Sequence, residues 1–129
     1  MKILSGIAAL SIALFVCAGA AQAEGNPEEG EAVFKKCRTC HDVGEGGKNK
    51  VGPVLNNIVG RKAASVDGFA YSTDMKNLGA KGFVWSEENL GKYLQNVKNV
   101  VANGKMVFPG LGDAQDREDV IAFLKKFNK

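Results

Sequence analysis

The chain has 129 residues, enough for one domain with a modest hydrophobic core, and it carries 17 basic against 14 acidic side chains. The resulting net charge of +3 is small and evenly mixed, which argues against a nucleic-acid-binding protein. Two of its three cysteines and its single histidine lie together in the stretch "KKCRTCHDV".

The first 23 residues have the pattern of a secretory signal peptide. Lys2 is followed by an uncharged apolar run, and Ala21-Gln22-Ala23 resembles a signal-peptidase site. An uncleaved membrane anchor is the alternative, because residues 3–23 come close to the roughly 20 apolar residues that span a bilayer. We favour cleavage, and therefore expect a periplasmic domain over residues 24–129, with a net charge of +2 and no stable membrane insertion.

The first helix of the mature chain is expected near its beginning. Asn26 is typical of a helix cap and Pro27 of the first helical turn. An apolar stripe at helical spacing then runs through Val33, and we expect it to continue to Cys40 and His41.

Further helices are predicted in the second half of the chain. One begins at Ser86 in "SEENLGKYLQNV", another covers "DAQDREDVIAFLKKF", and short helical pieces are expected in "NNIVG" and "STDMKNLG". The pattern predicts an all-α domain with three to five short helices and unusually long loops. Because such loops usually wrap something in a compact domain, a large apolar cofactor would supply the missing interior.

The cysteine and histidine cluster allows three kinds of site: a redox disulfide, a metal site or covalent haem. Thiols at helical positions i and i+3 lie about 5–6 Å apart on one surface. Both can then add to the vinyl groups of one haem, while the following histidine ligates its iron. A thioredoxin-like dithiol needs a βαβ context, a structural zinc needs four ligands, and a bare disulfide leaves the histidine unexplained. The motif favours one haem c bound through Cys37 and Cys40, with His41 as an iron ligand.

The single histidine excludes bis-histidine ligation within one chain, and the mature chain offers two methionines as candidates for the sixth iron ligand, Met75 and Met106. Met75 lies in a short polar segment, and we interpret it as a packing residue. Met106 lies between Asn103-Gly104 and Pro109-Gly110, which break the backbone on both sides, so this loop can lay a thioether over a haem face. A His/Met pair raises the reduction potential and closes the iron to other ligands, which predicts electron transfer.

Together with further motifs, these residues resemble the class I c-type cytochromes, especially bacterial cytochrome c2. The matching stretches are "GEAVFKKCRTCH", "GGKNKVGPVL", "VGRKAASVDGFAYS", "GKMVFPG" and "REDVIAFLKK". The resemblance implies the class I cytochrome c fold around one covalent haem. It also implies a monomeric, soluble carrier of single electrons between membrane-bound redox complexes, and not an enzyme.

The resemblance implies roles for further residues. Pro53 would offer its carbonyl oxygen to the second ring nitrogen of His41. Tyr93 would lie beside the sulfur of Met106, and Gly30 would allow the first and last helices to approach closely. Four residues match positions around the haem propionates: Arg61, Tyr71, Ser72 and Trp85.

The chain departs from the family in the loop "VKNVVANGKM". Relatives usually have prolines and a threonine where this chain has Val97, Ala102 and Gly104. One hydrogen bond to a propionate is therefore missing, and we expect a more mobile loop. Met75 occupies a position that is often asparagine.

The resemblance also implies a surface for redox partners. Five lysines match positions that ring the exposed haem edge: Lys36, Lys48, Lys50, Lys98 and Lys105. We expect this surface to bind acidic faces of a cytochrome bc1-type donor and of an acceptor such as a reaction centre or an oxidase. A mixed surface with no preferred face is the alternative.

Two other classes of function compete with the carrier. A haem enzyme or ligand sensor, such as a peroxidase, would have an open sixth position at the iron, but it would need a distal acid–base group and no second histidine exists. A haem-free thiol or metal protein would have no colour.

Overall fold

The computed structural model describes residues 24–129, and the predicted signal peptide lies outside the described residues. The elements follow in the order α1 (Pro27–Phe34), α2 (Thr73–Ala80), α3 (Glu87–Gln95), the 3-10 helix η1 (Val97–Asn99) and α4 (Ala114–Lys125). Among these residues the only β-pairing is an isolated bridge between Lys62 and Val84. The all-α prediction is confirmed. In the described range, no helix is both long enough and apolar enough to cross a membrane.

Each α-helix begins after a residue whose side chain accepts hydrogen bonds from backbone N–H groups of the first turn. These N-cap residues are Asn26, Ser72, Ser86 and Asp113. The first N–H groups of a helix have no partner inside the helix, so such a side chain fixes where the helix starts. The starts predicted at Asn26 and Ser86 are confirmed, and the short piece expected in "STDMKNLG" is α2.

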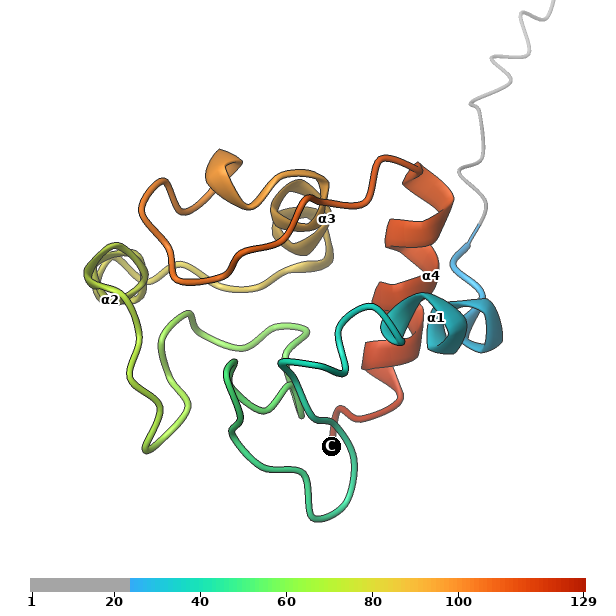
Figure 1. Ribbon diagram of the computed structural model, residues 1–129, viewed down its shortest axis with the longest axis horizontal. Helices are drawn as coiled ribbons and strands as arrows, with labels where there is room; N and C mark the ends of the chain where they lie inside the picture. The colour runs from blue at the N-terminus through green and yellow to red at the C-terminus, as the bar shows by residue number, and fades with distance from the viewer. Residues whose placement is uncertain (1–23) are drawn as a thin grey trace, which may run out of the picture.

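The tightest packing between helices is the crossing of α1 and α4 (Figure 1). A Cβ atom at Gly30 would lie 1.9 Å from the carbonyl oxygen of Asp119, so only glycine allows this approach. The rings of Phe34 and Phe123 pack beside it with centroids 5.2 Å apart. The buried Asp119 carboxylate accepts a hydrogen bond of 2.7 Å from the backbone N–H of Asn26. The crossing therefore fixes α1 along its length.

The remaining helices are arranged around long irregular segments. α3 packs against α4, and η1 follows α3 directly. α2 lies at the opposite side of the molecule from α1 and α4, and over the described residues it packs against no other helix (Figure 1). The irregular segments that connect these helices therefore supply most of the residues that face the interior.

Two details of the predicted helices are wrong. α1 ends at Phe34, so Cys40 and His41 do not continue a helix. After α1 the N–H groups of Cys37 and Cys40 bond three residues back, to Phe34 (2.8 Å) and Cys37 (3.1 Å), whereas His41 bonds four residues back, to Cys37 (2.9 Å). Residues 35–40 form turns rather than a continued helix.

The helical piece expected in "NNIVG" is also absent. Asn57 has a φ of 59° and Gly60 a φ of 87°, and neither angle is compatible with a right-handed helix. This segment is a pair of turns, and the path of its backbone is set by two residues in the left-handed conformation rather than by helical hydrogen bonds.

The α1–α4 crossing predicts opposite effects of alanine at two helical glycines. Gly30→Ala should lower the free energy of unfolding by at least about 2 kcal/mol, because the new methyl group overlaps the backbone of α4. Gly91→Ala in α3, where a Cβ would meet nothing within 4 Å, should raise it by about 0.5–1 kcal/mol. Denaturant unfolding of the two variants measures both values, and equal effects would contradict this view of the crossing.

Candidate functional site

A cavity of about 280 Å³ opens among the irregular segments, α2, α3 and α4. Most of its lining side chains are apolar, and several belong to the buried core. All ten residues predicted for the site line it: Cys37, Cys40, His41, Pro53, Arg61, Tyr71, Ser72, Trp85, Tyr93 and Met106. The structure thus brings together residues that span 70 positions of the sequence.

The imidazole of His41 is buried and held in one orientation. Its Nδ1 lies 2.8 Å from the carbonyl oxygen of Pro53, which can only accept, so Nδ1 carries the proton and Nε2 has a free lone pair. Burial lowers the pKa of His41 and outweighs the hydrogen bond to Pro53, which raises it, and the nearby charges of Arg61 and Lys50 also lower it. The ring is therefore neutral, and the lone pair on its Nε2 is available to ligate a metal.

Gly52 provides the space that the imidazole needs. A Cβ at this position would lie 2.3 Å from Cε1 of His41. The backbone N–H of Gly52 donates to the carbonyl of Cys40 at 2.8 Å, which ties this segment to the cysteine turn. The sequence analysis missed Gly52, although its place directly before Pro53 was a usable signal.

Two thiols and two thioethers reach the same cavity. Cys37 and Cys40 are free and partly buried, and burial raises the pKa of the Cys37 thiol. Met106 is partly buried on the loop between η1 and α4. Met75 packs against the core as expected, but it also lines the cavity, which the sequence analysis did not foresee.

The polar lining is mostly satisfied by the protein, with one exception. Nη1 of Arg61 donates to the carbonyls of Val54 (3.0 Å) and Asn56 (2.8 Å), whereas its Nε is buried and has no partner in the described part of the chain. A buried donor without a partner is costly, so this one indicates an acceptor in the occupied cavity. Ser72 Oγ accepts from the N–H of Met75 as the cap of α2, which leaves its hydroxyl hydrogen to donate.

Aromatic side chains of the lining form two pairs. The rings of Trp85 and Tyr93 lie 4.8 Å apart, with Phe83, outside the lining, edge-on to Trp85 at 5.2 Å, and Phe69 contacts Tyr71 edge-on at 4.8 Å. Burial raises the pKa of Tyr93 to about 12, so its hydroxyl remains a neutral donor. Tyr71 is fixed differently, because its hydroxyl oxygen accepts from the N–H of Val66 at 3.1 Å.

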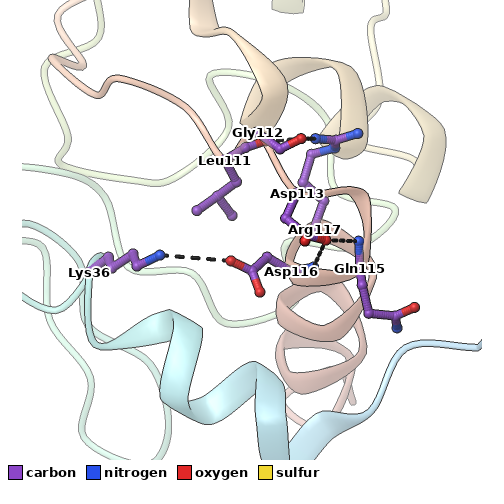
Figure 2. A network of polar contacts seen from close by, with 7 residues as sticks. All are labelled: Lys36, Leu111, Gly112, Asp113, Gln115, Asp116 and Arg117. Carbon is purple, nitrogen blue, oxygen red and sulfur yellow. Dashed lines mark hydrogen bonds and ion pairs between the residues drawn. The ribbon is translucent and has the colours of Figure 1, made fainter.

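The mouth of the cavity combines positive and apolar side chains. Lys36 and Lys105 line it, together with Val51 and Val107, which are 78% and 100% exposed. Figure 2 shows that Lys36 pairs with Asp116 at the start of α4, at 3.7 Å. The other three lysines predicted for this surface are exposed but do not line the cavity: Lys48, Lys50 and Lys98. The exposed valines were missed by the sequence analysis.

These residues fit a haem better than a bare metal ion. In the described range, no three or more His, Cys, Asp or Glu side chains are grouped to hold a metal, which excludes a structural zinc site there. The apolar walls suit a macrocycle, the thiols of Cys37 and Cys40 suit its vinyl groups, and the unpartnered Nε of Arg61 suits a propionate.

Comparison with known proteins extends over the whole region that forms the cavity. The cytochrome c family model matches residues 27–128. The chain is 54% identical over 112 residues to cytochrome c2 of Rhodomicrobium vannielii, covering 87% of each chain. It is 52% identical over 102 residues to cytochrome c-550 of Ancylobacter novellus, covering 79% of this chain and 95% of that one. The solved structure of cytochrome c2 from Rhodospirillum centenum superposes with a TM-score of 0.76 at 40% identity, covering 81% of this chain and all of that one.

The contact between Gly52 and His41 predicts a specific cost for a methyl group. Gly52→Ala should destabilise the haem-containing protein by about 1–3 kcal/mol, because the imidazole must move from its place beside Pro53. Gly112→Ala is the matched control, since a Cβ there meets nothing within 4 Å. Unfolding followed by visible absorption measures the difference, and equal stability of the two variants would contradict the proposed fit.

Proposed function

The chain belongs to the cytochrome c family, and on this premise we propose that it carries single electrons between redox complexes with its haem iron held by His41 and Met106. Cys37 and Cys40, the thiols of the family's attachment motif, bind the haem c covalently. The bound haem supplies the redox chemistry, since its iron takes up and gives back one electron. The observation that carries the proposal is the convergence of two thiols, a neutral imidazole and a thioether on one apolar cavity.

His41 is well prepared for its role as a ligand. The Pro53 carbonyl keeps the proton on Nδ1, and Gly52 leaves room for the ring, so Nε2 stays free and its direction is fixed. Because the ring is buried and neutral before it binds, little reorganisation is needed at this side of the cavity.

We assign the second ligand to Met106 rather than to Met75. Met106 lies on an irregular loop whose far end is anchored, because the N–H of Leu111 donates to the carbonyl of Leu94 at 2.7 Å. Arg117 holds the same end through the carbonyls of Leu111 and Gly112 (Figure 2). Both methionine side chains pack against the core, but Met75 is the third residue of α2, where its backbone N–H is held by the Ser72 cap.

The lining supports a carrier over an enzyme. Among the described residues the cavity is lined by no carboxylate, and the only histidine of the chain is engaged with Pro53. Peroxidase-type chemistry needs a group that moves protons at the distal side, and neither thioether can do so. A closed iron site that changes only its charge meets the requirements of electron transfer.

The ligand assignment predicts different outcomes for the two methionines. Met106→Ala should open the sixth coordination position, so that the ferrous protein binds carbon monoxide stoichiometrically and its reduction potential falls. Met75→Ala should keep a closed iron and change mainly stability, by about 2–3 kcal/mol for a partly buried side chain. A carbon-monoxide titration of both variants decides between them, and the reverse pattern would assign Met75 as the ligand.

The mouth of the cavity is the proposed route for electrons. Val51 and Val107 offer an exposed apolar contact, and Lys36 and Lys105 add positive charge beside it. We propose that Lys48, Lys50 and Lys98 extend this charge, so that acidic faces of a bc1-type donor and of a reaction centre or oxidase are attracted to it. Contacts of this kind are small and short-lived, which suits a monomeric shuttle between two complexes.

The lysine surface predicts how small redox reagents react with the protein. Oxidation of the ferrous protein by ferricyanide, an anion, should slow as salt is added, whereas oxidation by a cationic cobalt complex should not. Replacing Lys48 and Lys98 together by Gln should slow the ferricyanide reaction at least about twofold at low salt. Lys62→Gln, outside the proposed surface, is the control; equal slowing by Lys62→Gln would contradict a preferred face. Stopped-flow absorption provides the rates.

We also propose that the protein works in the periplasm after removal of residues 1–23. Residues soon after the proposed cleavage site already belong to the fold, since the N–H of Asn26 donates to Asp119 and α1 starts at Pro27. Cleavage after Ala23 would leave both of these features in the mature chain.

A further inference from the structure

Asp74 and Asn103 form a polar contact between two distant segments. Oδ2 of Asp74 accepts two hydrogen bonds, from the backbone N–H and from the side-chain Nδ2 of Asn103, each at 3.0 Å. Asp74 lies in the first turn of α2, and Asn103 lies three residues before Met106. We refer to this pair of hydrogen bonds as the clasp.

The clasp joins two walls of the same cavity. Tyr71, Ser72 and Met75 line it from one segment, and residues 105–108 line it from the other. Since α2 packs against no other helix in the described part of the chain, its contacts are with irregular segments, and this loop is one of them. Nζ of Lys105 donates to the carbonyl of Ala70 at 2.8 Å and links the same two segments a second time.

Backbone-to-backbone hydrogen bonds do not hold this loop. Between Val101 and Leu111, no backbone N–H of the described chain donates to a backbone carbonyl. Ala102, Asn103 and Gly104 are exposed, and glycine adds backbone freedom. The clasp therefore supplies order to a stretch that has neither secondary structure nor burial at that point.

We propose that Asp74 and Asn103 are positioning residues that hold the Met106 loop closed over the cavity. The inference rests on the proposed function, because it takes Met106 as the ligand that the loop delivers. A loop that opens uncovers the sixth coordination position, and the apparent affinity of an external ligand is scaled by the fraction of molecules that are open. Loss of the clasp raises that fraction and so tightens apparent binding.

Imidazole is the probe, and the ferric holoprotein is the sample. Because a hydrogen bond to a charged group is among the stronger ones, Asp74→Ala should lower the apparent Kd for imidazole about tenfold. Asn103→Ala, which keeps the backbone N–H, should lower it by less. Asp67→Asn is the matched control, since the exposed Asp67 carboxylate makes no hydrogen bond or ion pair with the described residues, and it should leave the Kd unchanged.

Two further variants separate positioning from a direct effect of charge. The exchange D74N/N103D keeps one amide and one carboxylate at the contact, so it should return the Kd toward the value of the unaltered protein. In a Met106→Ala background the site is open already, so adding Asp74→Ala should leave the imidazole Kd unchanged. The backbone N–H of Asn103, which the clasp holds, should exchange with solvent faster in Asp74→Ala than in the unaltered protein.

Three results would overturn the inference. In the first, the apparent Kd for imidazole is the same in Asp74→Ala, in Asn103→Ala and in the unaltered protein, which would mean that the loop stays closed without the clasp. Asp74→Ala could act equally in the Met106→Ala background, which would make it a charge effect on the site. Finally, the unaltered protein could bind imidazole as tightly as Met106→Ala does, which would remove Met106 as the ligand and the role of the clasp with it. Only this last result contradicts the proposed function.

Discussion

The contact between Gly30 and the backbone of α4 is the constraint on which the rest of the structure depends. It sets the distance between the first and last helices, and α1 leads within three residues to Cys37 and the turn that carries Cys40 and His41. The same crossing directs the inner side of α4, with Leu124, toward the cavity. A side chain at position 30 would move the attachment residues relative to the wall that they face. The position of the haem site thus follows from a helix contact that contains no functional residue.

The two sides of the site are held by different physical means. On the His41 side, burial, the carbonyl of Pro53 and the absence of a side chain at Gly52 leave one orientation for the imidazole. On the Met106 side, residues 102–110 donate no backbone-to-backbone hydrogen bond within the described chain, and the loop is tied by the Asp74 and Lys105 side chains and by the anchored Leu111. A neutral thioether binds without strong charge interactions, so its place depends on these ties. We infer that the histidine side is held rigidly and that the methionine side determines the fraction of molecules in which the sixth coordination position is covered.

Much of the fold and site could be predicted because the signals are local. Helix caps such as Asn26 and Ser86 act on the next few residues, and the spacing of Cys37, Cys40 and His41 carries its own chemistry. The end of α1 at Phe34 could not be predicted from the sequence, because the apolar residues keep their helical spacing where the helix changes to tighter turns. The turns at Asn57 depend on a left-handed residue that is not glycine, and the contact of Asp74 with Asn103 joins residues 29 positions apart. Such contacts follow from the path of the chain, and no pattern within either segment marks them.

An iron closed between His41 and Met106 would be visible in the absorption spectrum of the unaltered protein. We expect a low-spin spectrum in both oxidation states, a weak sulfur-to-iron charge-transfer band in the ferric protein, and no change when carbon monoxide is added to the ferrous protein. A high-spin ferric spectrum without that band, together with a shift on adding carbon monoxide, would contradict this expectation. That outcome would place the thioether away from the iron and direct attention to ligand binding.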